Sequence, residues 1–235
     1  MRFCKKYDIF LILKQSRSRQ FNGQRSTERR NCIHDNCLPE KFPSLVDIWP
    51  RSLEAFGDWH KPQYCPHKSD LATGFKFGWE PAKGGDIDDT GGNGFWLHCN
   101  GILDNPTSQS HAIGRTADFS EKFHSASCRK GDYLYGIQVH SEPFQRKGDD
   151  TTLNNVRLWC KNHQSGTEYQ LSEPKAPMWG SWTARVNCPK YYGMSGIKLC
   201  IEAWEEDNDD TSLGWIVPYC KPITLFADVS IDKRR

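Results

Sequence analysis

The sequence predicts an all-β protein of three antiparallel sheets arranged around a pseudo-threefold axis. Three observations lead to this fold class: a motif that occurs three times, period-two alternation of apolar residues within each copy, and the absence of long helical periodicity. A repeat on this scale has to be recognised before any other argument about the fold, because one structural unit is then used three times.

The repeated motif is an acidic pair, then a threonine and, nine residues after the threonine, a cysteine. It reads DIDDTGGNGFWLHC up to Cys99, KGDDTTLNNVRLWC up to Cys160 and DNDDTSLGWIVPYC up to Cys220. Upstream, each copy has a glycine-led segment (GFKFGWEP, GIQVHSEP or GIKLCIEA) and a further cysteine. The period is about 60 residues, so we expect one domain over residues 43–220. Its repeats cover 43–99, 100–160 and 161–220.

Alternating apolar and polar residues predict half-buried strands in each repeat. In GIQVHSEP, Ile137 and Val139 alternate with polar neighbours, and the run before each final cysteine alternates likewise. The final cysteine has the parity of the apolar residues, so its side chain should point into the core. With a leading piece such as SLVDIWP, each repeat has material for one small sheet. Because one small sheet cannot bury its apolar face alone, three sheets must share a core and form a prism.

Ten cysteines indicate an oxidising compartment and disulfide bonds. Six of them occupy repeated positions, 34, 32 and 32 residues apart within the repeats, and none of the six lies in a CxxC pair of the kind that zinc sites use. Pseudo-symmetry favours one bridge in each repeat: Cys65–Cys99, Cys128–Cys160 and Cys188–Cys220. The pairing of the others stays open: Cys4, Cys32, Cys37 and Cys200.

The chain ends differ from the repeats. Residues 1–42 are rich in Arg, Ser, Gln and Asn and carry no periodicity, so we expect a poorly ordered leader, for which a displaced start or a signal region stays open and in which no signal peptide is evident. Its apolar run IFLIL is too short for the hydrophobic part of a signal peptide. Residues 221–235 form a C-terminal extension with a strand-like centre, ITLFADVSI.

Charge and hydropathy exclude two classes of partner. A net charge of +2, from 31 basic and 29 acidic residues, gives no field strong enough to argue for nucleic acid. No window approaches the roughly 18 to 20 apolar residues needed to span a bilayer. We therefore expect a protein that binds neither nucleic acid nor a membrane, and the cysteines favour a secreted, extracellular one.

The repeated acidic pairs have three interpretations. Turns are favoured, because Asp side chains accept hydrogen bonds from nearby backbone amides and because a scaffold needs every corner, whereas an active site seldom needs three copies. Calcium binding comes second, although the spacing in EEDNDD is not that of an EF-hand loop. Catalytic carboxylates come last, so the sequence predicts no catalytic residue, metal or cofactor and leans against an enzyme without deciding the question. The pairs are Asp88–Asp89, Asp149–Asp150 and Asp209–Asp210.

Aromatic rings of outward parity are the candidates for ligand contact. Sugars could stack on these rings, and a protein neighbour or the tail of the chain could cover them equally well. The candidates are Trp96, His98, Trp159 and Tyr219.

The order and spacing of these motifs resemble the vitelline membrane outer layer protein family over about residues 43–220. The resemblance implies a β-prism of three Greek-key sheets and a structural protein of an extracellular coat, such as the egg vitelline membrane outer layer, with extracellular matrix or egg-coat proteins as partners. The alternatives are a lectin-like module for N-acetylglucosamine oligomers and, third, a transferase or hydrolase of chito-oligosaccharides. Two departures are ADFSEKF in place of a Gly-x-Trp motif and Ala203 in place of a turn proline. The motifs are FGDW with YCP at 56–66, GDDTTLNNVRLWC at 148–160, WGSW with NCP at 179–189, Glu80–Pro81 and Glu142–Pro143.

Overall fold

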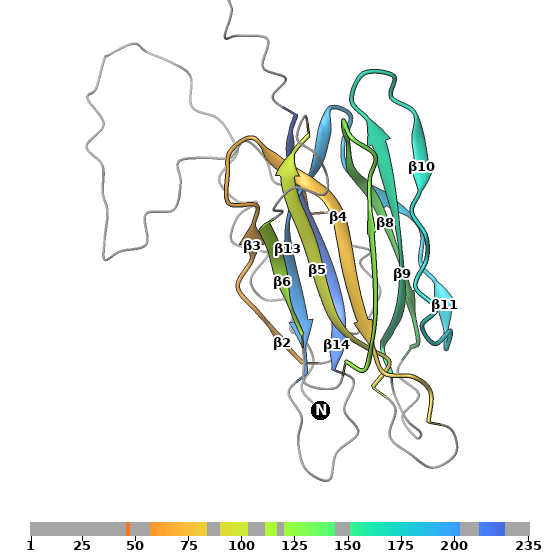
Figure 1. Ribbon diagram of the computed structural model, residues 1–235. Coiled ribbons are helices and arrows are strands. Elements are labelled where there is room, and N and C mark those ends of the chain that lie inside the picture. Colours follow the sequence, from red (N-terminus) through yellow and green to blue (C-terminus); the bar gives the residue numbers. More distant parts are fainter. Residues whose placement is uncertain are drawn as a thin grey trace, which may run out of the picture. The chain divides into compact units, whose positions relative to one another are not determined.

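The computed structural model describes seven stretches of the chain. They are residues 46–47, 57–83, 90–102, 111–116, 120–143, 151–202 and 212–223. Every regular element in these stretches is a β-strand, as the sequence predicts (Figure 1). The expected leader and all but the first three residues of the expected C-terminal extension lie outside the described residues.

The strands form three antiparallel sheets. The first sheet has the order β6-β5-β4-β7 and consists of β4 (Asp70–Trp79), β5 (Gly92–Gly101), β6 (His111–Thr116) and β7 (Lys122–Ser127). The second has the order β10-β9-β8-β11, with β12 also on β8, and consists of β8 (Asp132–Ser141), β9 (Leu153–Asn162), β10 (Glu168–Gln170), β11 (Ser181–Trp182) and β12 (Val186–Asn187). The third has the order β1-β14-β13-β2, with β3 also on β13, and consists of β1 (Val46–Asp47), β2 (Asp58–Trp59), β3 (Gln63–Tyr64), β13 (Tyr192–Ile201) and β14 (Leu213–Pro222).

Each sheet has Greek-key order, in which a fourth strand returns to lie beside the first. In the first sheet β7 returns to pair with β4, and in the second β11 returns to pair with β8. The third sheet is closed by the other end of the chain, because β1 pairs with β14 and β2 with β13. The Greek-key prediction is therefore confirmed by the strand pairing.

The sheets do not coincide with the sequence repeats. Strands β6 and β7 follow Cys99, yet they flank the β4–β5 hairpin that precedes it. Strands β10 to β12 likewise flank the β8–β9 hairpin. Each sheet thus takes its central hairpin from one repeat and its outer strands from the next. The expectation that one repeat supplies one complete sheet is wrong, because the strands that follow the β4–β5 and β8–β9 hairpins pair with the open edges of those hairpins.

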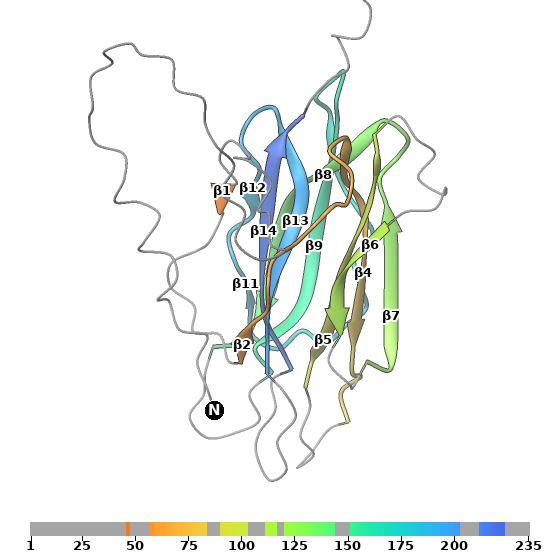
Figure 2. The ribbon, with the colours of Figure 1, turned by 90° about the vertical axis from the view of Figure 1, so that its left-hand side faces the viewer.

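The three sheets share one core (Figures 1 and 2). The central strands β4, β8 and β13 contact one another, and so do their hairpin partners β5, β9 and β14. Phe75 and Phe95 of the first sheet, Leu158 of the second and Ile197 of the third are at most 1% exposed. Because three apolar sheet faces turn to a common interior, the arrangement is a three-sided β-prism.

Three disulfides connect the sheets in a cycle. Cys65 follows β3 of the third sheet and bonds to Cys99 on β5 of the first. Cys128 and Cys160 join the first sheet to the second, and Cys188 and Cys220 join the second to the third. The three pairings confirm those expected from pseudo-symmetry, and the three final cysteines are fully buried.

A further cysteine, Cys200, is also disulfide-bonded. It lies on β13 and is fully buried. The other six described cysteines bond to one another, so the partner of Cys200 lies outside the described residues. Bonds of this number indicate an oxidising compartment.

Candidate functional site

The four aromatic residues singled out in the sequence lie on three different sheets. Trp96 and His98 are on β5, Trp159 is on β9 and Tyr219 is on β14, and all four are half-buried. Three of them occupy equivalent positions, because His98, Trp159 and Tyr219 each lie opposite a glycine of the neighbouring central strand. The structure therefore does not bring the four together into one site.

Two of these rings are covered by a side chain from a flanking strand or turn. The guanidinium of Arg185 lies 4.4 Å from the ring centroid of Trp159, and the ring of Tyr64 lies 5.5 Å from that of Tyr219. Gly136 makes room for Arg185, since a Cβ there would lie 2.9 Å from Nε of that arginine. Arg185 and Tyr64 thus take up part of the surface of these two rings on which a sugar could stack.

At the equivalent place on the first sheet the flanking residue is small. Gly74 lies opposite His98 and faces the short side chain of Ser127, whose Oγ would lie 2.7 Å from a Cβ at that glycine. We call the outer surface around it the first-sheet face. It consists of Gly74, Lys76, Gly78, Gly94, Trp96, His98, Gly114, Phe123, Ser125 and Ser127.

Glycines allow the two large rings of the first-sheet face to lie against the sheet. The indole of Trp96 extends over Gly94 and Gly114, where an added Cβ would lie 2.7 Å and 2.9 Å from ring atoms. The ring of Phe123 lies against Gly78 in the same way, at 2.9 Å. Phe123 remains 48% exposed, so this face presents an aromatic surface to solvent.

The ammonium of Lys76 lies between these two rings. Its Nζ is 5.0 Å from the centroid of Trp96 and 4.2 Å from that of Phe123, within the range of cation–π attraction. Within the described stretches Lys76 forms no ion pair with a carboxylate. The rings therefore hold a positive charge in one place without neutralising it.

His98 supplies a neutral polar group beside this charge. Burial lowers the pKa of His98 below its ordinary value of 6.5, and the nearby charge of Lys76 lowers it further. At neutral pH the imidazole is therefore uncharged and can both donate and accept a hydrogen bond.

The second-sheet face is built differently, because its cations are paired with carboxylates. We define it by Tyr135, Arg157, Trp159, Lys161, Glu168, Glu173, Trp182 and Arg185. Arg157 donates to Glu173 at 2.7 Å while its guanidinium lies 3.9 Å from the centroid of Trp182. Glu168 accepts from both Lys161, at 3.0 Å, and Arg185, at 2.8 Å.

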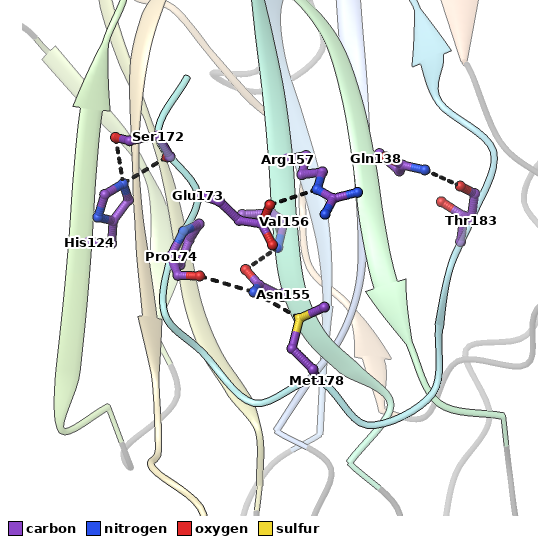
Figure 3. A network of polar contacts seen from close by, with 10 residues as sticks. All are labelled: His124, Gln138, Asn155, Val156, Arg157, Ser172, Glu173, Pro174, Met178 and Thr183. Atoms are coloured by element: carbon purple, nitrogen blue, oxygen red, sulfur yellow. Dashed lines mark hydrogen bonds and ion pairs between the residues drawn. The ribbon is translucent and has the colours of Figure 1, made fainter. Parts of the chain in front are cut away.

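The segment from β10 to β12, which includes β11, is fastened along this sheet by polar contacts (Figure 3). Asn155 Nδ2 donates to the carbonyl of Pro174 at 3.1 Å and contacts the sulfur of Met178, while Gln138 donates to the carbonyl of Thr183 at 2.6 Å. His124 of β7 lies 2.8 Å from the carbonyl oxygen of Ser172 and so links the first sheet to this segment. Side chains of the second sheet are thus largely used in internal contacts.

The three acidic pairs lie outside the described residues, so neither their turns nor a calcium site can be assigned to them. Their neighbours are described. Thr90, which follows the first pair, donates its hydroxyl to the buried carboxylate of Glu80 at 3.0 Å. Thr151, which follows the second pair, donates to Glu142 at 2.9 Å. In both EP motifs, the glutamate therefore accepts a hydrogen bond from the threonine that follows the acidic pair.

Next to these side-chain contacts lies a second repeated feature, a backbone hydrogen bond beside a β-bulge. It is not among the features predicted from the sequence. The backbone N–H groups of Glu80, Glu142 and Glu202 donate at 2.8 to 2.9 Å to the carbonyls of Gly91, Thr152 and Ser212. These three acceptors have left-handed φ angles of 65°, 48° and 54°. The strand pairing shifts register directly beside them, as in a β-bulge. Glycine in the first copy was the available signal, since it favours this conformation.

The part of the chain that the structure describes has neither a metal-binding cluster nor a membrane-spanning helix. No group of three or more His, Cys, Asp or Glu side chains is arranged there to hold a metal ion. None of the described residues forms a helix long and apolar enough to cross a membrane.

Comparison with known proteins identifies relatives. The family model of vitelline membrane outer layer protein I matches residues 50–163. The chain is 31% identical to the mouse vitelline membrane outer layer protein 1 homolog, over 77% of this chain and 84% of that protein, and 33% identical to the human homolog, over 70% and 77%. Among solved structures, the agglutinin of Calystegia sepium matches with a TM-score of 0.47 at 9% identity, over 77% of this chain and 98% of that chain. The chain belongs to the vitelline membrane outer layer protein I family.

Proposed function

We propose that this protein is a secreted structural component of an extracellular coat, as the name of its relatives suggests for the outer layer of the vitelline membrane. The observation that carries the proposal is the cycle of disulfides within a member of this family. Each bond joins two different sheets, so that separating any one sheet from the prism requires two covalent bonds to break. Such bracing suits a protein that has to persist outside the cell.

The coat proposal is tested by co-sedimentation with isolated vitelline membrane outer layer. The oxidised protein should pellet with the layer and stay bound through a high-salt wash. Protein reduced under denaturing conditions and alkylated should stay in the supernatant, because the prism is lost. If the oxidised protein also stays in the supernatant, the coat function is wrong.

A second function, glycan binding, is favoured by the first-sheet face. An exposed aromatic ring lies there beside a half-buried indole and histidine, and aromatic faces are the groups on which sugars stack. A glycosidase would need two carboxyl groups facing the sugar, and the residues by which this face is defined include none. We therefore propose binding of oligosaccharides and not their cleavage.

Calorimetric titration with N-acetylglucosamine oligomers tests the second function. Phe123→Ser should weaken binding about fivefold, since a stacking contact contributes on the order of 1 kcal/mol. Met178→Ser is the matched control, because Met178 is 50% exposed and lies outside the first-sheet face. Equal affinity of Phe123→Ser and the parent protein would place binding elsewhere.

A further inference from the structure

The first-sheet face differs from the second-sheet face in the balance of its charges. Arg157, Lys161 and Arg185 each have a carboxylate within 3.0 Å. Lys76 has two aromatic rings and, within the described residues, no carboxylate partner. A cation without a counter-charge keeps its full attraction for an anion that comes from outside.

We propose that the first-sheet face selects acidic oligosaccharides, in which a sulfate ester or a carboxylate accompanies the sugar rings. The inference rests on the glycan binding proposed above and names the chemical class of its ligand. A sugar that stacks on Phe123 comes close to the ammonium of Lys76, which is held 4.2 Å from the centre of that ring. An acidic substituent on the sugar can then accept a charge-assisted hydrogen bond from the ammonium.

The polar groups around Lys76 fit the rest of such a ligand. Ser125 and Ser127 are exposed on the same side of β7 as Phe123 and can hydrogen-bond to sugar hydroxyls. Gly74, which faces Ser127, has no side chain to raise the surface beside that hydroxyl. Aromatic surface, hydroxyl groups and a cation that has no carboxylate partner in the described stretches are thus presented together.

The other two sheets supply internal comparisons. The residue equivalent to Lys76 in the second sheet is Gln138, and in the third it is Lys198, as their strand registers show. Lys198 lies 5.0 Å from the centroid of Trp59. The ring of Tyr64, however, lies against Gly196 in the third sheet, where the first sheet has only Ser127. Lys198 therefore has the same charge as Lys76 on a more covered surface.

The experiment compares a neutral N-acetyllactosamine oligomer, its 6-sulfated form and its sialylated form, each titrated into the full chain by calorimetry. We expect both acidic forms to bind at least about tenfold more tightly than the neutral one, with a ratio that shrinks as salt is added. Lys76→Gln copies the residue of the second sheet and should reduce the ratio to near one. Lys198→Gln, the same change on the third sheet, should leave the ratio unchanged.

The outcomes separate the inference from the function on which it rests. Equal binding of neutral and acidic forms would overturn the acidic preference and leave glycan binding in place. No binding of any form would overturn both. A preference for acidic forms that survives Lys76→Gln but is lost in Lys198→Gln would overturn the assignment to the first-sheet face. Preference for only one of the acidic forms, lost in Lys76→Gln, would support the inference and identify the anionic group.

Discussion

The outer faces of the first and second sheets show how one strand framework can carry two different surfaces. In the first sheet Lys76 of β4 lies opposite Trp96 of β5, and in the second sheet the same pair of positions holds Gln138 and Arg157. The cation thus lies on the first strand of the hairpin in the first sheet and on the second strand of the hairpin in the second sheet. In both sheets it still lies over the aromatic ring of the returning strand, Phe123 or Trp182.

The comparison separates what the fold requires from what it leaves free. A cation over the outer ring is retained in the third sheet as well, where Lys198 lies over Trp59. Among the residues that the structure describes, carboxylates pair with these cations only on the second-sheet face, through Glu168 and Glu173. The cation–π contact therefore belongs to the framework, and the unpaired charge of the first-sheet face is a local property.

The largest expected effect comes from cutting the covalent link between the two sheets under comparison. Replacing both Cys128 and Cys160 by Ser opens a bridge that spans 32 residues and should lower the free energy of unfolding by about 3 to 4 kcal/mol. Urea unfolding followed by tryptophan fluorescence measures the change. The matched control replaces Cys188 and Cys220 by Ser, because that bridge has the same separation but joins the second sheet to the third. A loss below about 1 kcal/mol would show that the sheets do not depend on the bridge.

A smaller effect is expected from filling one glycine position of the first-sheet face. Gly114 has a φ angle of 149°, and an added Cβ would lie 2.2 Å from the carbonyl oxygen of Phe95. Gly114→Ala should therefore cost about 2 to 3 kcal/mol, because the obstructing atom belongs to the backbone of the paired strand. Ala112→Ser, on the same strand at an exposed position, should change stability by less than about 0.5 kcal/mol. Equal stability of the two variants would contradict the close approach of the β5 backbone to Gly114.

Arg157 and Lys76 should differ in how much each contributes to the free energy of unfolding. Arg157→Met removes both the contact with Trp182 and the ion pair with Glu173, so we expect a loss of about 1 to 2 kcal/mol at low salt, part of which disappears at high salt. Lys76→Met removes only the contact with its rings and should cost less than about 1 kcal/mol. Thermal unfolding at two salt concentrations measures both. The opposite ranking would mean that Lys76 has a partner in the folded protein.

Much of the framework could be predicted from sequence because it is local or repeated. Period-two alternation identified the central strands, and the shared parity of Cys99 with its apolar neighbours placed it in the core. The covers of the candidate rings could not be predicted in the same way. Arg185 and Tyr64 reach Trp159 and Tyr219 from strands or turns that belong to other repeats. Alternation predicts a strand and its inward face, but it does not predict the hairpin with which that strand pairs.

The smallest expected effects are in pH dependence, where the two faces should respond in different ranges. Burial and the charge of Lys76 lower the pKa of His98, so the unfolded state takes up a proton more readily than the folded state. The contribution of neutral His98 is complete above the ordinary pKa of 6.5 and is lost as the pH falls through the lower folded value. His60 and His140 also have lowered pKa values, so the His98→Gln variant should lose only part of the slope below pH 6.5.

On the second-sheet face the corresponding group is Glu168. Partial burial alone would raise its pKa, but hydrogen bonds from Lys161 and Arg185 outweigh that effect and hold the pKa below 4.5. Its contribution is present above pH 4.5 and is lost as the pH falls through the folded value. Urea midpoints measured from about pH 3 to about pH 8 should therefore show Glu168→Gln altering the slope only below pH 4.5 and His98→Gln only below pH 6.5. If Glu168→Gln left the acid slope unchanged, the ion pairs of Glu168 with Lys161 and Arg185 would not form in solution, and the charge contrast between the two faces would rest on Arg157 and Glu173 alone.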